Sequence, residues 1–240
     1  MNLIQVDTYE ALSERAADMI AAVVAAKPTA AVVLATGDTP MGAYRVLATR
    51  HAARRFDASA LRAFQLDAYL DLAPDDSRSL YGWLAQSFLQ PLGVPPAHVV
   101  RLPGDAPDPQ AVCRAYDDAV DAVGGFDLSI LGLGPNGHLG FNEPPSAADL
   151  PTRVVTLTEA SIQSNARYWG GRDRVPLQAL TCGMKQLLAA RQTILVVSGA
   201  RKRDILRQTL HGPITPEVPA SLLRLAPNVT VIADRDALPT

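Results

Sequence analysis

A histidine and a glutamate lie within a glycine-rich stretch, LGLGPNGHLGFNEP at residues 131–144, that cannot form a regular helix or strand. The apolar run before it, residues 126–130, follows a glycine pair and is typical of a buried strand. Loops that leave the carboxyl ends of parallel strands bind ligands in α/β proteins, so His138 and Glu143 are candidates for catalysis. Glu143 can orient the imidazole and stabilise its charged form. The pair therefore predicts an enzyme that moves protons.

The same stretch also satisfies G-x-G-x-x-G, the dinucleotide-binding pattern, through Gly132, Gly134 and Gly137. That pattern requires a helix to begin inside it, whereas residues 141–145 read FNEPP and show little sign of one. An acidic residue ending a second strand about 20 positions later is also missing. We therefore expect the glycines to let the backbone fold tightly around His138. The alternative is an exposed loop histidine without a role.

Asp67 is the candidate general base, because it directly follows an apolar strand expected at residues 61–66. Its carboxylate would point into the same crevice as the other strand-end loops. Asp71 is the competing choice. A lone aspartate at a strand end can equally be a turn residue or a helix cap.

The segment ATGDTPM, residues 35–41, lies between a buried strand and the start of a helix and is a candidate phosphate site. Gly37 permits close backbone approach, Thr39 offers a hydroxyl group, and the helix start presents unpaired N–H groups to an anion. Alternatively, Asp38 or Thr39 merely caps the helix. Because an inward-pointing carboxylate would repel phosphate, we expect Asp38 to face away.

Two cations could complete that site. Lys202 follows the strand expected at residues 193–197 and begins a helix, so it could reach the same crevice. Arg167 precedes a glycine-rich segment, residues 170–172, that could act as a mobile lid. Both could equally be solvated surface charges.

Strand and helix patterns alternate along the whole chain. After an amino-terminal strand, a capped helix runs to Pro28, and further strands are expected at 30–34, 61–66, near 99, 126–131, 154–157, 193–197 and 229–232. Helices are expected between them at 39–49, 79–89, 109–123, 159–168 and 202–210. This alternation predicts a three-layer, Rossmann-like α/β fold, with a mostly parallel sheet and helices on both faces. No internal repeat divides the chain, so we expect one domain over residues 1–240.

The 240 residues are 48% hydrophobic and 19% charged, which is ordinary for a soluble globular protein with a substantial core. A net charge of -2 argues against a nucleic-acid binder, and no apolar run is long enough for a membrane helix. The first residues lack a secretory pattern, so a cytoplasmic protein is expected. Cys113 and Cys182 form no metal or disulfide pattern, and we expect both to be buried apolar residues.

Six features of the chain occur in the order seen in the glucosamine-6-phosphate deaminase family. They are ATGDTPMGAY, the strand-end Asp67, LGLGPNGHLGFNEP, NARYW, TCGMKQLL and PNVTVIAD. The resemblance spans about residues 32–234, and GHLGFNEP is its most specific motif. It implies conversion of an amino-sugar 6-phosphate into a ketose 6-phosphate and ammonia, with neither a metal nor an organic cofactor. By motif, Asp67 matches the base that moves a proton between C2 and C1. His138 matches the ring-opening histidine, Glu143 its paired carboxylate, and Asn136 a member of the same relay.

The resemblance also places Gly37, Thr39, Arg167 and Lys202 around the substrate phosphate. Two positions depart from the family pattern: Ala68 stands where glutamate is usual, and Asp38 stands where glycine is common. These departures bear on substrate identity more than on reaction class. The partner implied is therefore a small sugar phosphate, with no nucleic acid and no membrane, bound by a monomer or a homo-oligomer.

Three alternatives to glucosamine 6-phosphate deamination stay open. Galactosamine-6-phosphate deaminases belong to the same group and share the lysine in TCGMKQLL. The 6-phosphogluconolactonases share the fold and a similar glycine-histidine loop. A sugar-phosphate sensor is the third, but we expect such a regulator to carry a helix-turn-helix segment, for which the amino terminus has no room.

Overall fold

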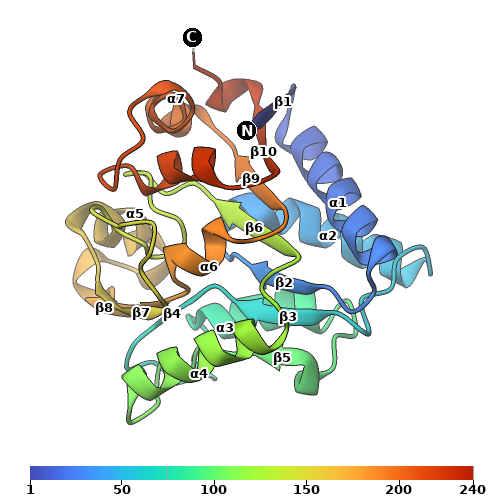
Figure 1. Ribbon diagram of the computed structural model, residues 1–240, viewed down its shortest axis with the longest axis horizontal. Coiled ribbons are helices and arrows are strands. Elements are labelled where there is room, and N and C mark those ends of the chain that lie inside the picture. The colour runs from blue at the N-terminus through green and yellow to red at the C-terminus, as the bar shows by residue number, and fades with distance from the viewer. Residues whose placement is uncertain (74, 240) are drawn as a thin grey trace.

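A seven-stranded, wholly parallel sheet forms the centre of the computed structural model, which describes residues 1–73 and 75–239 (Figure 1). In spatial order its strands are β1 (Asn2–Val6), β10 (Val229–Asp234), β9 (Thr193–Val197), β6 (Leu128–Gly132), β2 (Ala31–Leu34), β3 (Arg62–Gln65) and β5 (Val99–Val100). The predicted parallel α/β class is thus confirmed.

Helices cover both faces of this sheet, as predicted. One face carries α1 (Tyr9–Ala26), α2 (Asp38–Ala52) and α3 (Leu80–Leu84), which continues as a π-helical turn at Ala85–Leu89. The other face carries α4 (Pro109–Ala122), α6 (Met184–Leu188) and α7 (Arg203–His211). No helix in residues 1–73 and 75–239 is long and apolar enough to span a membrane.

Side-chain alternation along β2 shows how one strand serves two cores. Val32 and Leu34 pack toward α1 and α2, whereas Ala31 and Val33 pack toward α4. All four residues are buried, because a central parallel strand is covered on both sides. The uninterrupted apolar sequence of this segment follows from that position.

The α1 helix begins where the sequence predicts. The Thr8 hydroxyl caps it by accepting a 3.2 Å hydrogen bond from the Ala11 amide, and the helix ends before Pro28. Its inner stripe, which recurs every three or four residues, is fully buried: Leu12, Ala16, Ala17, Ile20 and Val24. This stripe attaches the helix to the sheet.

A second, three-stranded antiparallel sheet was not predicted. It consists of β4 (Asp67–Tyr69), β8 (Gln178–Thr181) and β7 (Arg153–Thr156), and α5 (Glu159–Trp169) packs against it. The strand expected at 154–157 therefore exists, but outside the parallel sheet. β4 and β8 are too short to give a clear periodic pattern, and α6 was missed for the same reason.

The remaining connections contain short 3₁₀ turns, at Pro96–His98, Arg172–Arg174, Ala200–Lys202, Pro219–Leu225 and Arg235–Ala237. Cys113 and Cys182 are free and buried, as expected.

The strand order reverses between β2 and β6. From β2 the chain proceeds outward through β3 and β5, and from β6 it proceeds in the opposite direction through β9 and β10. The loops after these two central strands therefore separate and open a crevice at the carboxyl end of the sheet, where doubly wound proteins bind ligands. This topology fixes the place of the candidate site.

Candidate active site

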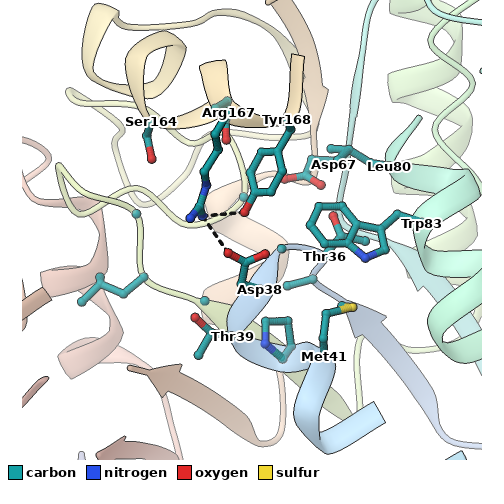
Figure 2. A pocket seen from close by; sticks show the side chains of 18 of the residues that line it. Thr36, Asp38, Thr39, Met41, Asp67, Leu80, Trp83, Ser164, Arg167 and Tyr168 are labelled. Atoms are coloured by element: carbon teal, nitrogen blue, oxygen red, sulfur yellow. Dashed lines mark hydrogen bonds and ion pairs between the residues drawn. The ribbon is translucent and has the colours of Figure 1, made fainter. Parts of the chain in front are cut away.

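A cavity of about 1770 Å³ opens at this switch point. Its wall includes the loop after β2, the start of β4, the loop after β6, α5 and the turn after β9. Asp67, His138, Arg167 and Lys202 all line it, so residues far apart in sequence meet in one place. Figure 2 shows the end of this cavity that lies between α2 and α5.

Asp67 lies at the junction of the two sheets, because β3 ends at Gln65 and β4 begins at Asp67 itself. The Gln65 side chain donates a 2.8 Å hydrogen bond to the Asp67 carbonyl and fixes the bend. The Asp67 side chain is buried at 8% exposure, and burial raises its pKa to about 7. A carboxylate with this pKa can both accept and return a proton near neutral pH.

Asp71, the competing choice, is exposed and does not line the cavity. Ala68, where the family usually has glutamate, packs in the apolar core and likewise lies outside the cavity wall. Its methyl group therefore faces away from any ligand in the cavity.

His138 and Glu143 form a pair. The imidazole Nδ1 lies 3.3 Å from Glu143 Oε2 and 3.0 Å from the Ser161 hydroxyl, while the ring lines the cavity. Because Nδ1 is engaged on the far side, Nε2 is the nitrogen available to a ligand. Glu143 is only 7% exposed and stands behind His138, outside the cavity wall.

Asn136 joins this pair from the same loop. Its side-chain amide donates a 2.8 Å hydrogen bond to Glu143 Oε2, and its oxygen accepts the His138 backbone amide at 3.2 Å. Burial raises the pKa of Glu143, but the hydrogen bond and charge of His138, together with Ser161 and Asn136, outweigh burial and lower it to about 2. Glu143 is therefore a permanent anion beside the imidazole.

Sequence analysis missed two hydroxyl groups that complete this arrangement, Thr158 and Ser161. The Thr158 hydroxyl donates a 3.0 Å hydrogen bond to Glu143 Oε2 and also caps the amino terminus of α5. The positive end of the α5 dipole therefore adds to the stabilisation of the carboxylate. A threonine directly before the helix expected at 159–168 is a typical cap and was the available signal, but its approach to Glu143 depends on tertiary packing.

Arg153, on β7, was also missed, and it braces the Glu143 loop from behind. Its guanidinium donates to the Asn142 side chain at 2.7 Å and to the Ser146 hydroxyl at 2.9 Å. Ser146 in turn donates a 2.6 Å hydrogen bond to the Glu143 carbonyl. One arginine thus holds the residue before Glu143 and the hydroxyl group that binds the Glu143 carbonyl.

The other end of the cavity is suited to an anion. Gly37 is the N-cap of α2, has a φ of 103° that only glycine adopts easily, and makes no side-chain cap bond. The first turn of α2 therefore presents backbone N–H groups beside Thr39. The alternative that Asp38 or Thr39 caps this helix is wrong: Asp38 is the first helical residue.

Lys202 supplies a cation to this end from the 3₁₀ turn Ala200–Lys202. Its ammonium donates a 2.6 Å hydrogen bond to the Leu133 carbonyl. Burial, with a smaller effect of Arg167, lowers the pKa of Lys202 to about 8. Asp234, unnoticed in the sequence, holds the preceding turn by accepting from the Ser198 hydroxyl and the Gly199 amide.

Asp38 does not face away from the cavity, so that expectation is wrong. Its carboxylate lines the wall and forms a 2.8 Å ion pair with Arg167 on α5, as Figure 2 shows. Arg167 also donates a 2.6 Å hydrogen bond to the Tyr168 hydroxyl. The fold places the two residues opposite each other across the cavity, an arrangement that local sequence cannot indicate.

Within the ranges 1–73 and 75–239, no group of three or more His, Cys, Asp or Glu side chains is arranged to hold a metal ion. The site is built from a buried carboxylate, an imidazole–carboxylate pair and an anion-binding end.

The sequence profile of one protein family, described as glucosamine-6-phosphate isomerases/6-phosphogluconolactonase, matches residues 5–232. The chain belongs to this family. Among its members, a glucosamine-6-phosphate deaminase from Halothermothrix orenii is 38% identical over 237 residues, which cover 99% of this chain and 98% of that protein. A glucosamine-6-phosphate deaminase from a Geobacillus species is 39% identical over 238 residues, or 99% of this chain and 95% of that protein.

Solved structures agree with this membership. A monomeric glucosamine-6-phosphate deaminase matches with a TM-score of 0.96 at 39% identity, covering 99% of this chain and 98% of the other. The 6-phosphogluconolactonase of Trypanosoma brucei matches with a TM-score of 0.81 at 20% identity, covering 98% and 97%. The second likeness shows the shared family fold alone.

The glycine-rich loop folds tightly around His138, as expected, and substitution of Gly134 tests this close approach. A Cβ atom on Gly134 would lie 2.1 Å from the His138 ring, so a side chain there must displace the imidazole. We expect Gly134→Ala to reduce turnover by roughly tenfold or more, since a displacement of about 1 Å can cost about 100-fold in rate. Steady-state kinetics and thermal melting measure the effect.

Gly132→Ala is the matched control, because a Cβ atom at that position would meet no atom within 4 Å. It should be clearly milder than Gly134→Ala. Equal effects of the two substitutions would contradict a specific role for the close approach to His138.

Proposed function

We propose that this protein converts glucosamine 6-phosphate and water into fructose 6-phosphate and ammonia. The observation that carries the proposal is the presence, in one cavity, of a buried carboxylate with a pKa of about 7, Asp67, and of the His138 ring backed by Glu143. Two separate proton transfers can therefore act on one bound sugar. Relatives at 36–39% identity that carry the name glucosamine-6-phosphate deaminase support the same reaction.

Ring opening comes first, because the C2 hydrogen of a pyranose becomes acidic only when C1 is a carbonyl. His138 takes the proton of the C1 hydroxyl and delivers a proton to the ring oxygen, which breaks the C1–O5 bond. Between these steps the imidazole is positively charged. The Glu143 anion, 3.3 Å from Nδ1, stabilises that form.

Asp67 then removes the C2 proton, and the C1 carbonyl oxygen gains the proton that the ammonium group at C2 gives up, so a neutral enolamine forms. Protonated Asp67 returns its proton to C1, which leaves an imine at C2. Water adds to C2 and ammonia leaves, so the product is the 2-ketose. Each positioned proton transfer contributes roughly 10²- to 10⁴-fold in rate.

The phosphate would be held by the start of α2, Thr39, Lys202 and Arg167. A dianion fixed remote from C1 and C2 restricts the reacting carbons relative to Asp67. Gly37 allows the backbone to approach the phosphate, and the helix dipole favours its charge.

Lys202 provides a test of this end of the site. We expect Lys202→Met to raise KM by about tenfold or more, because a charge-assisted contact to phosphate is lost. In the unsubstituted enzyme KM should also rise with pH above the Lys202 pKa of about 8, since deprotonation removes the same charge. This pH dependence should disappear in Lys202→Met.

Lys185→Met is the matched control, because Lys185 is exposed and does not line the cavity. Its KM should equal that of the unsubstituted enzyme at every pH. An unchanged KM in Lys202→Met would exclude Lys202 from the phosphate site.

The decisive assay is release of ammonia and fructose 6-phosphate from glucosamine 6-phosphate. Galactosamine 6-phosphate, the epimer, should be compared in parallel and would yield tagatose 6-phosphate. In deuterated water, deuterium should appear at C1 of the product, because Asp67 exchanges its proton. Hydrolysis of 6-phosphogluconolactone without turnover of either amino sugar would replace the deaminase proposal with the lactonase reaction.

We further propose a cytoplasmic location and no nucleic-acid or membrane partner. The similarity to a monomeric deaminase supports a monomer over a homo-oligomer, and sedimentation analysis at micromolar concentration tests it.

A further inference from the structure

The ion pair between Asp38 and Arg167 lies at the anion-binding end of the cavity. Asp38 is the first residue of α2, directly beside the N–H groups of that helix, and Arg167 reaches it from α5. Arg167 Nη2 is shared between Asp38 Oδ2 at 2.8 Å and the Tyr168 hydroxyl at 2.6 Å. The guanidinium therefore already has an anionic partner where a phosphate is expected.

Helix capping does not account for this carboxylate. Gly37, not Asp38, is the N-cap, and no side chain caps α2. The Asp38 side chain instead contacts Arg167 across the cavity (Figure 2).

Charge makes this contact unfavourable for binding a phosphate. Arg167 and Lys202 bring two positive charges to this end, and the Asp38 carboxylate offsets one of them. A phosphate that contacts Arg167 must break or share the ion pair and must also approach a second anion. Like charges placed together oppose binding and can discriminate between ligands.

The pair is also easy to break. Its side chains are 60% and 58% exposed, and exposed ion pairs stabilise a protein by only about 0–1 kcal/mol. Arg167 can therefore exchange Asp38 for a ligand oxygen at small cost.

We propose that Asp38 competes with the substrate phosphate for Arg167 and so limits how tightly the sugar phosphate binds. The inference rests on the proposed function, since it assigns the phosphate to this end of the cavity. It predicts that removing the Asp38 charge tightens binding of phosphate.

The test is calorimetric titration with inorganic phosphate at constant ionic strength. Asp38→Asn should bind phosphate roughly three- to tenfold more tightly than the unsubstituted protein. Arg167→Ala should bind it more weakly. The gain from removing the Asp38 charge should be clearly smaller in the Arg167→Ala background, because the competition acts through Arg167 and only the direct repulsion between Asp38 and phosphate remains there. Asp38→Asn should also lower KM for glucosamine 6-phosphate by a similar factor, with a smaller change in kcat.

Asp18→Asn is the matched control. Asp18 forms an ion pair of 2.7 Å with Arg50, is 54% exposed and lies outside the cavity wall. Removing its charge alters net charge as Asp38→Asn does, so it should leave phosphate affinity unchanged.

Unchanged phosphate binding in Asp38→Asn would overturn the inference. Weaker binding would overturn it as well, because Asp38 would then position Arg167 for the phosphate. A gain of the same size in the Arg167→Ala background would overturn the competition for Arg167. If Asp38→Asn binds phosphate more tightly but no amino-sugar phosphate is turned over, the proposed function fails and the competition stands.

Discussion

Asp67→Asn should lower kcat by about 10³- to 10⁴-fold, because an amide cannot remove the C2 proton. The substitution keeps the shape of the side chain, so binding of the phosphorylated sugar should change little. Single-turnover kinetics and calorimetry with inorganic phosphate separate the two effects. A rate near that of the unsubstituted enzyme would exclude Asp67 as the base.

Asp71→Asn is the matched control, because Asp71 is exposed and outside the cavity wall. Its φ of 58° is one that asparagine tolerates well, so the fold is preserved. This variant should retain full activity.

The pH profile provides a second signature of Asp67. The base must be ionised, so kcat/KM should fall as pH drops below about 7. Glu143 cannot cause this decrease, since its pKa of about 2 keeps it ionised throughout. Asp67→Asn should lose this limb from its residual activity.

Burial of Asp67 also predicts a gain in stability on substitution. Its pKa is raised from an ordinary 3.8 to about 7 in the folded state, so the folded protein binds the proton more tightly. The free energy of unfolding therefore decreases as pH rises between these values, and above them the buried charge is a full penalty. Asp67→Asn should melt at a higher temperature than the unsubstituted protein above pH 7, with the difference shrinking in acid.

Glu143→Gln should reduce kcat by roughly 10²- to 10³-fold, because the imidazolium formed during ring opening loses its anion. The amide also fits poorly: Oε2 accepts from Asn136 and Thr158, which forces the new NH₂ group toward the Oε1 position. No partner for Oε1 exists among the described residues. The variant should therefore be less stable as well, as thermal melting will show.

Glu159→Gln is the matched control. Glu159 is the first residue of α5 and directly follows Thr158. Its side chain is 64% exposed and pairs with Arg172 outside the cavity wall. It should keep normal kinetics. If Glu143→Gln stays within a few-fold of the unsubstituted rate, ring opening does not depend on this carboxylate.

Much of this protein follows from local sequence. The parallel sheet is encoded by short, fully apolar strands such as residues 31–34, which alternate with amphipathic helices such as α1. Glycines at 37 and 134 mark turns that only glycine fits, one by its positive φ and one by its approach to His138. The family, the strand-end position of Asp67 and the closeness of His138 to Glu143 were all readable from motifs a few residues long.

Only the tertiary structure decided which distant groups meet. The antiparallel sheet begins at Asp67 and buries it, which gives that carboxylate its pKa near 7. Thr158, Ser161 and Arg153 support the Glu143 loop from segments that local patterns treat as caps or strand ends. Asp38 and Arg167 are 129 positions apart in the sequence, yet their charged groups lie 2.8 Å apart because α5 faces the start of α2 across the cavity. Periodicity and capping reflect interactions within a few residues, whereas desolvation and ion pairing depend on the complete packing of the chain.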